Sequence, residues 1–292
     1  MPPLSEILLS WKLNIPALLL AAVVLVLYVR GLTVLSRGRT AWNPFRTVAF
    51  VTGLLLFLYL ACGFPGVYAP QLRWAFILQL TGYVFVVPLL LGAGRPLSLA
   101  RLTLGENGRR RVDAFMGGRP VRFLSHPVVA PLLGLALFAS LLGPGLYTMR
   151  SSAVASVLLT LLAPLLGLLL VLPALEGEER PASSAVMVVA FIYVFIELLA
   201  DAIPGIMLRL SPTVLDGVTG AVQGALPWFP GALRDQQLAG DLLWFVAEVV
   251  DLPLIILMMV RFQRADRADA RRIDELSDEE LEELNRRHLH RG

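Results

Sequence analysis

The sequence has few residues that bind metals or form disulfides. Its one cysteine, Cys62, permits no intramolecular disulfide and no Cys-x-x-Cys motif. The three histidines are His126, His288 and His290, and none of them lies inside an apolar run. Bis-histidine haem ligation within a bilayer is therefore excluded, and a b-type electron carrier with it.

Charged residues are also scarce. They make up 16% of the 292 residues, whereas hydrophobic residues make up 57% and the mean hydropathy is +0.71. Ordinary soluble domains have about 25% charged and roughly 45–50% apolar residues. The composition predicts a membrane protein and argues against a soluble enzyme, a secreted disulfide scaffold or a nucleic-acid-binding domain. The Gly-x-Ser-x-Gly, His-Glu-x-x-His and phosphate-loop motifs are absent as well, so nothing in the sequence supports an enzyme.

Apolar runs recur along most of the chain. A helix needs about 20 residues to cross a hydrocarbon core of about 30 Å, and lipid leaves a single spanning segment no other way to satisfy its backbone. The predicted fold is therefore all-α, a polytopic seven-transmembrane-helix bundle. Its expected spans are residues 13–29, 47–63, 72–92, 128–147, 154–173, 184–203 and 238–260.

The distribution of basic residues predicts the orientation of these spans. With the N-terminus outside, the cytoplasmic side receives twenty of the 25 Lys and Arg residues and the outer side five. The first run lacks a basic n-region and an Ala-x-Ala site, so we expect a retained span and not a cleaved signal. The transmembrane domain is predicted at 1–260 and a charged cytoplasmic tail at 261–292. In the tail, Ser277 and Glu280 have the spacing of a capping box, which predicts a short helix.

An acidic stripe marks the last predicted span. Asp241, Trp244, Glu248 and Asp251 follow at spacings of three, four and three, which places them on one helical face. Charged groups at bilayer depth are costly, so this face is expected to point into the bundle, toward a partner or toward water. Glu197, in the sixth span, is a candidate facing residue. These carboxylates either bind a cation or relay protons, or they are structural groups whose pKa is raised by burial.

Soft-metal ligands are few. Cu(I) prefers thiolate and thioether ligands, and the expected outer ends of the helices offer Cys62, Met149 and Met207. No motif links these residues, and a single cysteine at a helix end is more often a small apolar side chain. A shared metal site and ordinary packing both stay open, and the cofactor is unknown.

A second pattern lies at the mouth of the last span. The run from Asp235 and Gln236 to Gly240 is followed by Trp244 and Glu248. This run resembles the Asp-Gln signature of the CtaG-type cytochrome c oxidase assembly factors, polytopic proteins of bacterial inner membranes. Further matches lie in the third span, which keeps the glutamine of the family at Gln79, and at His126 with Pro127 before the fourth span.

The resemblance implies a role in the biogenesis of a haem-copper oxidase. The chain would be a non-enzymatic scaffold in the bacterial plasma membrane, with the lipid bilayer and oxidase subunits as partners. Asp235 and Gln236 are expected to order the outer mouth, and Trp244, Glu248 and Asp251 to line the interior face of the last span. The alternative is a small transporter or ion-conducting protein that uses the acidic stripe.

The third span departs from the family pattern. Where the family carries a His-Met-x-Gln-His arrangement, this chain has Phe76 and Leu80 at the histidine positions and keeps only Gln79. Those histidines are the natural ligands if the family handles copper. Their absence argues against a direct copper role for this chain.

Overall fold

The computed structural model describes residues 2–38, 40–124, 126, 129–176, 202–219 and 226–274. These residues form helices and turns, and no strand occurs among them, which confirms the all-α class for this part of the chain. The chain divides into two compact units. Unit 1 comprises Met1–Gly177 and Glu197–Asp251, and unit 2 comprises Glu178–Ile196 and Leu252–Gly292.

Asparagine side chains set where the first long helices begin. α2 (Ile15–Arg37) follows Asn14, whose side chain accepts a hydrogen bond from the amide three residues on, at 3.2 Å. α3 (Pro44–Cys62) follows Asn43, which accepts from the amide two residues on, at 2.9 Å. Such an acceptor satisfies an amide that the helix leaves free, and a proline in the first turn is pre-organised for the helix. The first two predicted spans are therefore helices with shifted ends.

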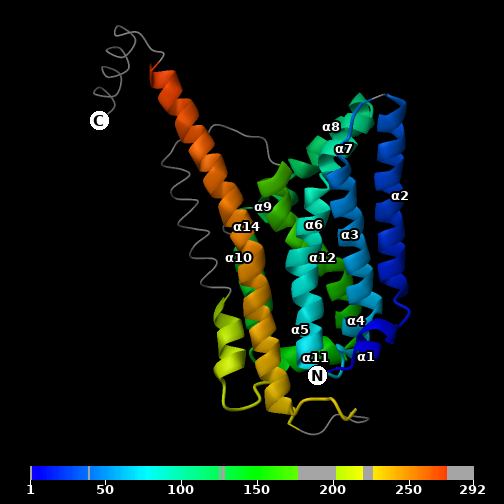
Figure 1. Ribbon diagram of the computed structural model, residues 1–292, viewed down its shortest axis with the longest axis vertical. Coiled ribbons are helices and arrows are strands. Elements are labelled where there is room, and N and C mark those ends of the chain that lie inside the picture. The colour runs from blue at the N-terminus through cyan, green and yellow to red at the C-terminus, as the bar shows by residue number, and fades with distance from the viewer. Residues whose placement is uncertain are drawn as a thin grey trace. The chain divides into compact units, whose positions relative to one another are not determined.

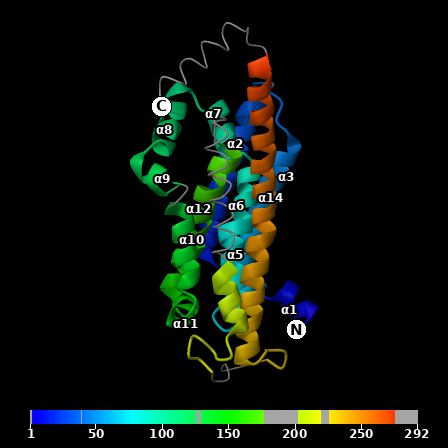
Figure 2. The same cartoon turned by 90° about the vertical axis from the view of Figure 1, so that its left-hand side faces the viewer.

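The third span forms the centre of unit 1. It consists of α5 (Arg73–Thr81), the π-helical turn η1 (Gly82–Val86), α6 (Val87–Ala93) and α7 (Pro96–Thr103). Figures 1 and 2 show α5, η1 and α6 in one line, and α3 and α12 (Ala153–Glu176) pack against it. Buried residues make up 72% of its most apolar window, against 22% for α2. The third span is thus the central helix of the unit, whereas α2 is peripheral.

The fourth predicted span is not one straight helix. α10 (Val129–Ala139) and α11 (Pro144–Ser151) meet at an angle of 92°. Pro144 has no amide proton to continue the first helix, and Gly143 precedes it in an extended conformation, with φ 178°. The Gly-Pro pair therefore turns the chain where an apolar run alone predicts an uninterrupted span.

Short helices connect the long ones. They are α1 (Leu4–Leu9), α4 (Phe64–Tyr68), α8 (Glu106–Met116) and α9 (Arg119–Leu124). In Figure 1, α7 and α8 lie at one end of unit 1, and α1, α4 and α11 lie at the other end. The arginine-rich connection in α8 is therefore far from the end at which the first helix begins.

The last described helices are the segment 202–210 and α14 (Ala232–Asp274). α14 is 43 residues long and continues beyond the predicted end of the last span at 260. The predicted sixth span, 184–203, lies almost entirely outside the described residues, and so does the tail helix expected around Ser277.

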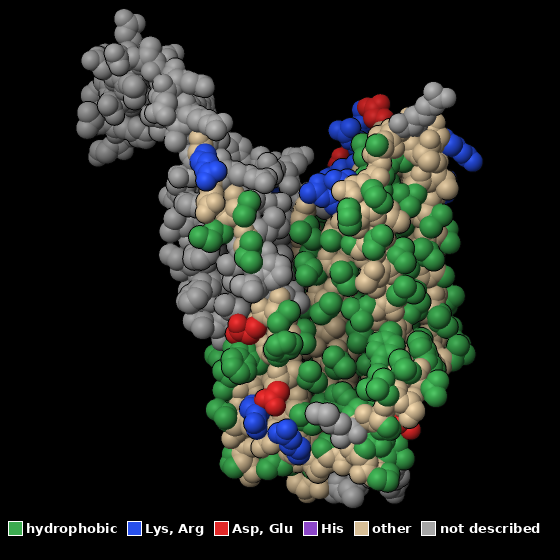
Figure 3. Space-filling view, viewed as in Figure 1, with side chains coloured by type: hydrophobic (Ala, Val, Ile, Leu, Met, Phe, Trp, Pro, Cys, Tyr) green, Lys and Arg blue, Asp and Glu red, His purple; other side chains and the backbone are tan. Residues whose placement is uncertain are grey.

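Several helices have the length and composition of membrane spans. Among the described residues three qualify, and a fourth does so if α10 and α11 together form one broken span. Figure 3 shows apolar side chains over the middle of unit 1 and charged side chains gathered toward its ends. The chain is thus a helical membrane protein, while the number of seven spans stays a prediction.

Candidate functional site: a buried ion cluster at the mouth of α14

Arg73 is the centre of a buried ion cluster in unit 1. It is the first residue of α5 and is only 2% exposed. Its Nε and Nη2 donate to the two carboxylate oxygens of Asp216 at 3.0 and 2.6 Å, and its Nη1 donates to Asp235 at 3.3 Å. A bidentate pair of this kind fixes both distance and orientation. The cluster therefore joins α5 to the loop 211–219 and to the start of α14.

Asp235 also caps the N-terminus of α5. Its two carboxylate oxygens accept the backbone amides of Arg73, at 2.8 Å, and of Trp74, at 3.1 Å. These amides have no partner within the helix, and the positive end of the helix dipole favours a carboxylate there. Burial raises the pKa of the Asp235 carboxyl above its usual value, while the hydrogen bonds from the two amides lower it. Hydrogen bonds from α5, about 160 residues away in sequence, thus take the place of the water that the buried carboxylate loses.

Arg150 brings α11 to the same cluster. Its Nη2 lies 3.6 Å from Asp216, and its Nη1 donates to the carbonyls of Pro70 and Gln71 at 2.9 and 3.2 Å. The guanidinium lies 5.3 Å from the ring centre of Tyr147. Two arginines and two aspartates balance in charge, as burial of ions requires.

Gln236, fully buried beside Asp235, organises the neighbouring loop. Its Nε2 donates to the carbonyls of Leu208 and Thr213 at 3.3 and 3.0 Å, and its Oε1 accepts the amide of Leu215 at 2.7 Å. All these partners are backbone groups, and they satisfy the polar atoms of the buried Gln236 side chain. The Asp-Gln pair therefore has two structural tasks, because Asp235 holds α5 and Gln236 holds the loop that carries Asp216.

Gly240 allows a close helix crossing one turn further along α14. A Cβ at Gly240 would lie 2.6 Å from the carbonyl oxygen of Gly205 and 2.7 Å from the amide nitrogen of Arg209. The side chain of Arg209 then pairs with Asp241 at 2.8 Å, with both side chains about 40% exposed. The glycine of the signature thus lets α14 pack against the helical segment 202–210.

The acidic stripe differs from this mouth in its environment. The Trp244 indole donates to Glu248 at 2.9 Å, and both side chains are exposed, Trp244 by 46%. Phe245 and Val249 are exposed beside them. The described residues therefore place Trp244 and Glu248 on the surface of unit 1, not along the interior face expected from the sequence. The side chain of Asp251, and Glu197 as a whole, lie outside what the structure describes.

The weak metal-ligand candidates have other partners or surroundings. Cys62 is buried, and its carbonyl accepts the Lys12 amide at 2.7 Å. The Met149 sulfur accepts a hydrogen bond from Ser140 at 3.7 Å, and Met207 is 48% exposed. Gln79 donates to the Leu60 carbonyl at 2.7 Å.

These surroundings do not suit a copper ion. Phe76 and Leu80, at the two positions where the family pattern has histidine, are buried apolar side chains. No group of three His, Cys, Asp or Glu residues placed to hold a metal occurs in the described part of the chain. The residues that the structure shows therefore do not fit a resident copper.

The sequence pointed to the two mouth residues on α14, Asp235 and Gln236, but not to Arg73, Arg150 and Asp216, which complete the cluster. Arg73 and Arg150 appear in the sequence as ordinary outer-side arginines, and Asp216 lies in a Gly- and Pro-rich loop. Their position could have pointed to them. Each arginine lies at one end of an apolar run, where a short loop keeps it near the helix bundle.

Unit 1 is thus a helical unit with several candidate membrane spans, and the Asp-Gln run at the start of α14 is built into a buried ion cluster. The cytochrome c oxidase caa3 assembly factor family matches residues 26–265, and the chain belongs to this family. Two relatives are an uncharacterized protein of Mycobacterium bovis and one of Mycobacterium tuberculosis, each 23% identical over 97% of this chain. The chain spans only 45% of the length of either relative. No solved structure matches.

Proposed function

We propose that the chain is a non-enzymatic membrane scaffold that assists the biogenesis of a haem-copper cytochrome c oxidase. The observation that carries this proposal is the family match over residues 26–265, because it covers every described helix from α3 to the start of the tail. The proposed setting is the bacterial plasma membrane, with seven spans, an outer N-terminus and a cytoplasmic C-terminus. Subunits of the oxidase are the proposed partners.

The exposed face of α14 is the proposed contact surface for the oxidase. Trp244, Phe245, Glu248 and Val249 form it, and we call them the α14 face. An exposed carboxylate near the middle of a span is costly in lipid, and among the described residues the donor to Glu248 is the Trp244 indole. A partner helix that brings a second donor lowers that cost. This favours a protein contact over lipid at the α14 face.

The test uses a strain that lacks the native copy and carries variants of this chain. Glu248→Ala, and Asp251→Ala beside it, are expected to lower the amount and activity of the oxidase while the chain remains at its normal level in the membrane. Asp241→Ala is the matched control, because its carboxylate already pairs with Arg209. An unchanged oxidase in both Glu248→Ala and Asp251→Ala contradicts the assignment of the α14 face.

The proposal includes no resident copper. After anaerobic loading with Cu(I), the purified chain is expected to hold no copper above the level of its Cys62→Ser variant, measured by mass spectrometry. The reason is that Cys62 is the one thiol and the positions of the family's histidines are apolar. Stoichiometric copper that disappears in Cys62→Ser would instead assign the chain a part in copper supply.

A further inference from the structure

A deep apolar groove crosses one side of unit 1. Its volume is about 700 Å³, and it lies among α2, α7 and α12, with residues of α3 and α6 also lining it. We call it the α2–α12 groove. Apolar side chains that line it include Leu20, Val24, Phe57, Leu91, Leu161 and Leu168. Cavities of about 300–1,000 Å³ are the size that binds small molecules, and this lining suits a hydrocarbon chain.

Further lining residues lie at the end of α7 and about two turns before the end of α2. Arg30, Thr103 and Gly105 line the groove there. Arg30 is exposed, and no carboxylate of the described residues lies within ion-pair distance of it. The ion pairs found at this end of the unit are Arg101 with Asp113, Arg109 with Asp113, and Arg110 with Glu106. The groove thus combines a long apolar lining with the Arg30 guanidinium, which has no counter-charge among the described residues.

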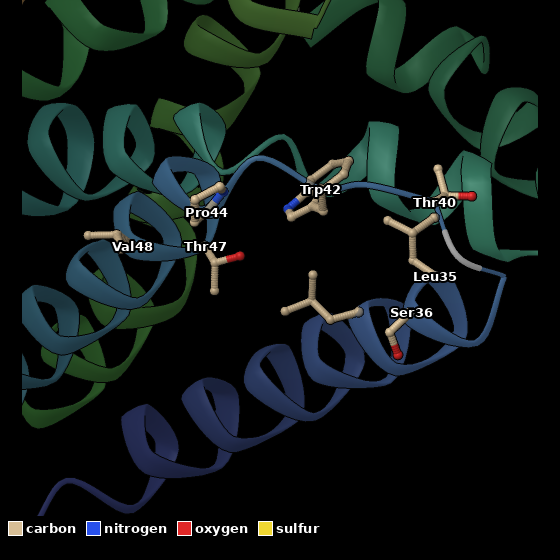
Figure 4. A pocket seen from close by; sticks show the side chains of 8 residues that line it. Leu35, Ser36, Thr40, Trp42, Pro44, Thr47 and Val48 are labelled. Carbon is tan, nitrogen blue, oxygen red and sulfur yellow. The ribbon is translucent and has the colours of Figure 1, made fainter.

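One wall of the groove is fixed by a hydrogen-bonded tyrosine. The Tyr28 hydroxyl donates to the Gly94 carbonyl at 3.1 Å and accepts the Trp42 indole at 3.4 Å. Trp42 lines a separate pocket of about 450 Å³ between the ends of α2 and α3, shown in Figure 4. Because Tyr28 and Trp42 belong to different pockets and bond to each other, they separate the groove from that pocket. The Tyr28 hydroxyl is therefore occupied and leaves Arg30 as the charged group that an occupant meets.

We propose that the α2–α12 groove binds one anionic phospholipid, with an acyl chain among the apolar side chains and the phosphate beside Arg30. Both features are needed for this choice. The apolar lining accepts any long hydrocarbon, whereas the exposed guanidinium selects a negatively charged headgroup, and basic pockets between membrane helices bind such headgroups. A neutral isoprenoid quinone satisfies the first feature only.

The experiment is native mass spectrometry of the full chain, delipidated in a mild detergent and incubated with equal amounts of dioleoylphosphatidylglycerol and dioleoylphosphatidylcholine. The expected result is one retained phosphatidylglycerol per chain. Arg30→Gln is expected to weaken its retention about fivefold, the factor that corresponds to about 1 kcal/mol for one basic residue at an anionic surface. Arg37→Gln, an exposed arginine of the same helix that does not line the groove, is the charge control and is expected to retain the lipid.

A second variant tests the apolar part of the site. Ala100→Phe adds a ring inside the groove and is expected to displace the lipid, whereas Ala22→Phe adds the same ring on the exposed side of α2 and is expected to leave retention unchanged. Equal retention of both phospholipids overturns the proposal, as does full retention by Arg30→Gln or by Ala100→Phe. Co-purification of a neutral quinone in place of phospholipid overturns it as well.

Discussion

Replacement of Asp235 by alanine is expected to uncouple α5 from α14. The change removes a counter-charge from the buried Arg73 guanidinium and the acceptor of two amides at the start of α5. Breaking a buried ion pair from one side costs about 3–5 kcal/mol, and loss of a helix cap about 1 kcal/mol. The two costs overlap because one carboxylate serves both contacts. Arg73 also keeps its bidentate pair with Asp216, so we expect about 3 kcal/mol of lost stability.

The assay is thermal unfolding of the purified full chain in one detergent. For a chain of this size a loss of 1 kcal/mol lowers Tm by about 2–4 °C, so Asp235→Ala is expected to lower Tm by about 6–12 °C. The matched control is Asp241→Ala on the same helix, whose pair with Arg209 is about 40% exposed. Exposed pairs contribute about 0.2–1 kcal/mol, and the control should lower Tm by at most about 4 °C. A Tm for Asp235→Ala within the range of the control refutes the structural role of the cluster.

Two further predictions concern the packing of α14 and the docking of α1. Gly240→Ala places a Cβ against backbone atoms of the segment 202–210, so it should lower stability by about 1–3 kcal/mol in the same unfolding assay, whereas Gly231→Ala, with nothing within 4 Å, should change it little. Hydrogen bonds from Tyr68 and Ser10 lower the pKa of Glu6, so their contribution to stability is present above pH 4.5 and is lost as the pH falls through the lowered value. The Tm in the same unfolding assay should then fall at acid pH, and Tyr68→Phe should move this fall to a higher pH; a Tm that responds to neither change would contradict the α1 contact.

The sequence predicted the helical class well, because hydrophobic composition and run length decide it almost alone. It predicted the ends of α3 and α12 to within about three residues, since each is one uninterrupted apolar run, whereas α2 continues eight residues past the predicted end at 29. It failed at α11, where a Gly-Pro pair inside an apolar run turns the chain by 92°. A hydropathy average over many residues hides such a pair, whereas the missing amide proton of one proline is enough to end a helix.

Of the residues at the mouth, only those on α14 could be predicted from the sequence. The resemblance to the family's Asp-Gln signature singled out Asp235 and Gln236, and both side chains are buried. Arg73, the partner of Asp235, lies about 160 residues away in sequence, and Asp216 pairs with Arg73 from a similar distance. No local pattern encodes such pairs. The environment of the acidic stripe could not be predicted from the sequence either. Helical spacing shows that these side chains share one face of the helix, but it does not show what packs against that face.

The two kinds of acid on α14 should therefore produce different defects. Asp235 is 2% exposed and is engaged by two amides and a guanidinium, so a partner cannot reach it, and its loss should reduce the amount of folded chain. Glu248 is exposed with one indole donor, so its loss should leave the chain intact and reduce only the oxidase. Membrane abundance of the chain, measured beside oxidase activity in the same cells, separates these effects. If Glu248→Ala lowers both in proportion, the α14 face stabilises the chain itself, and the contact with the oxidase must lie elsewhere.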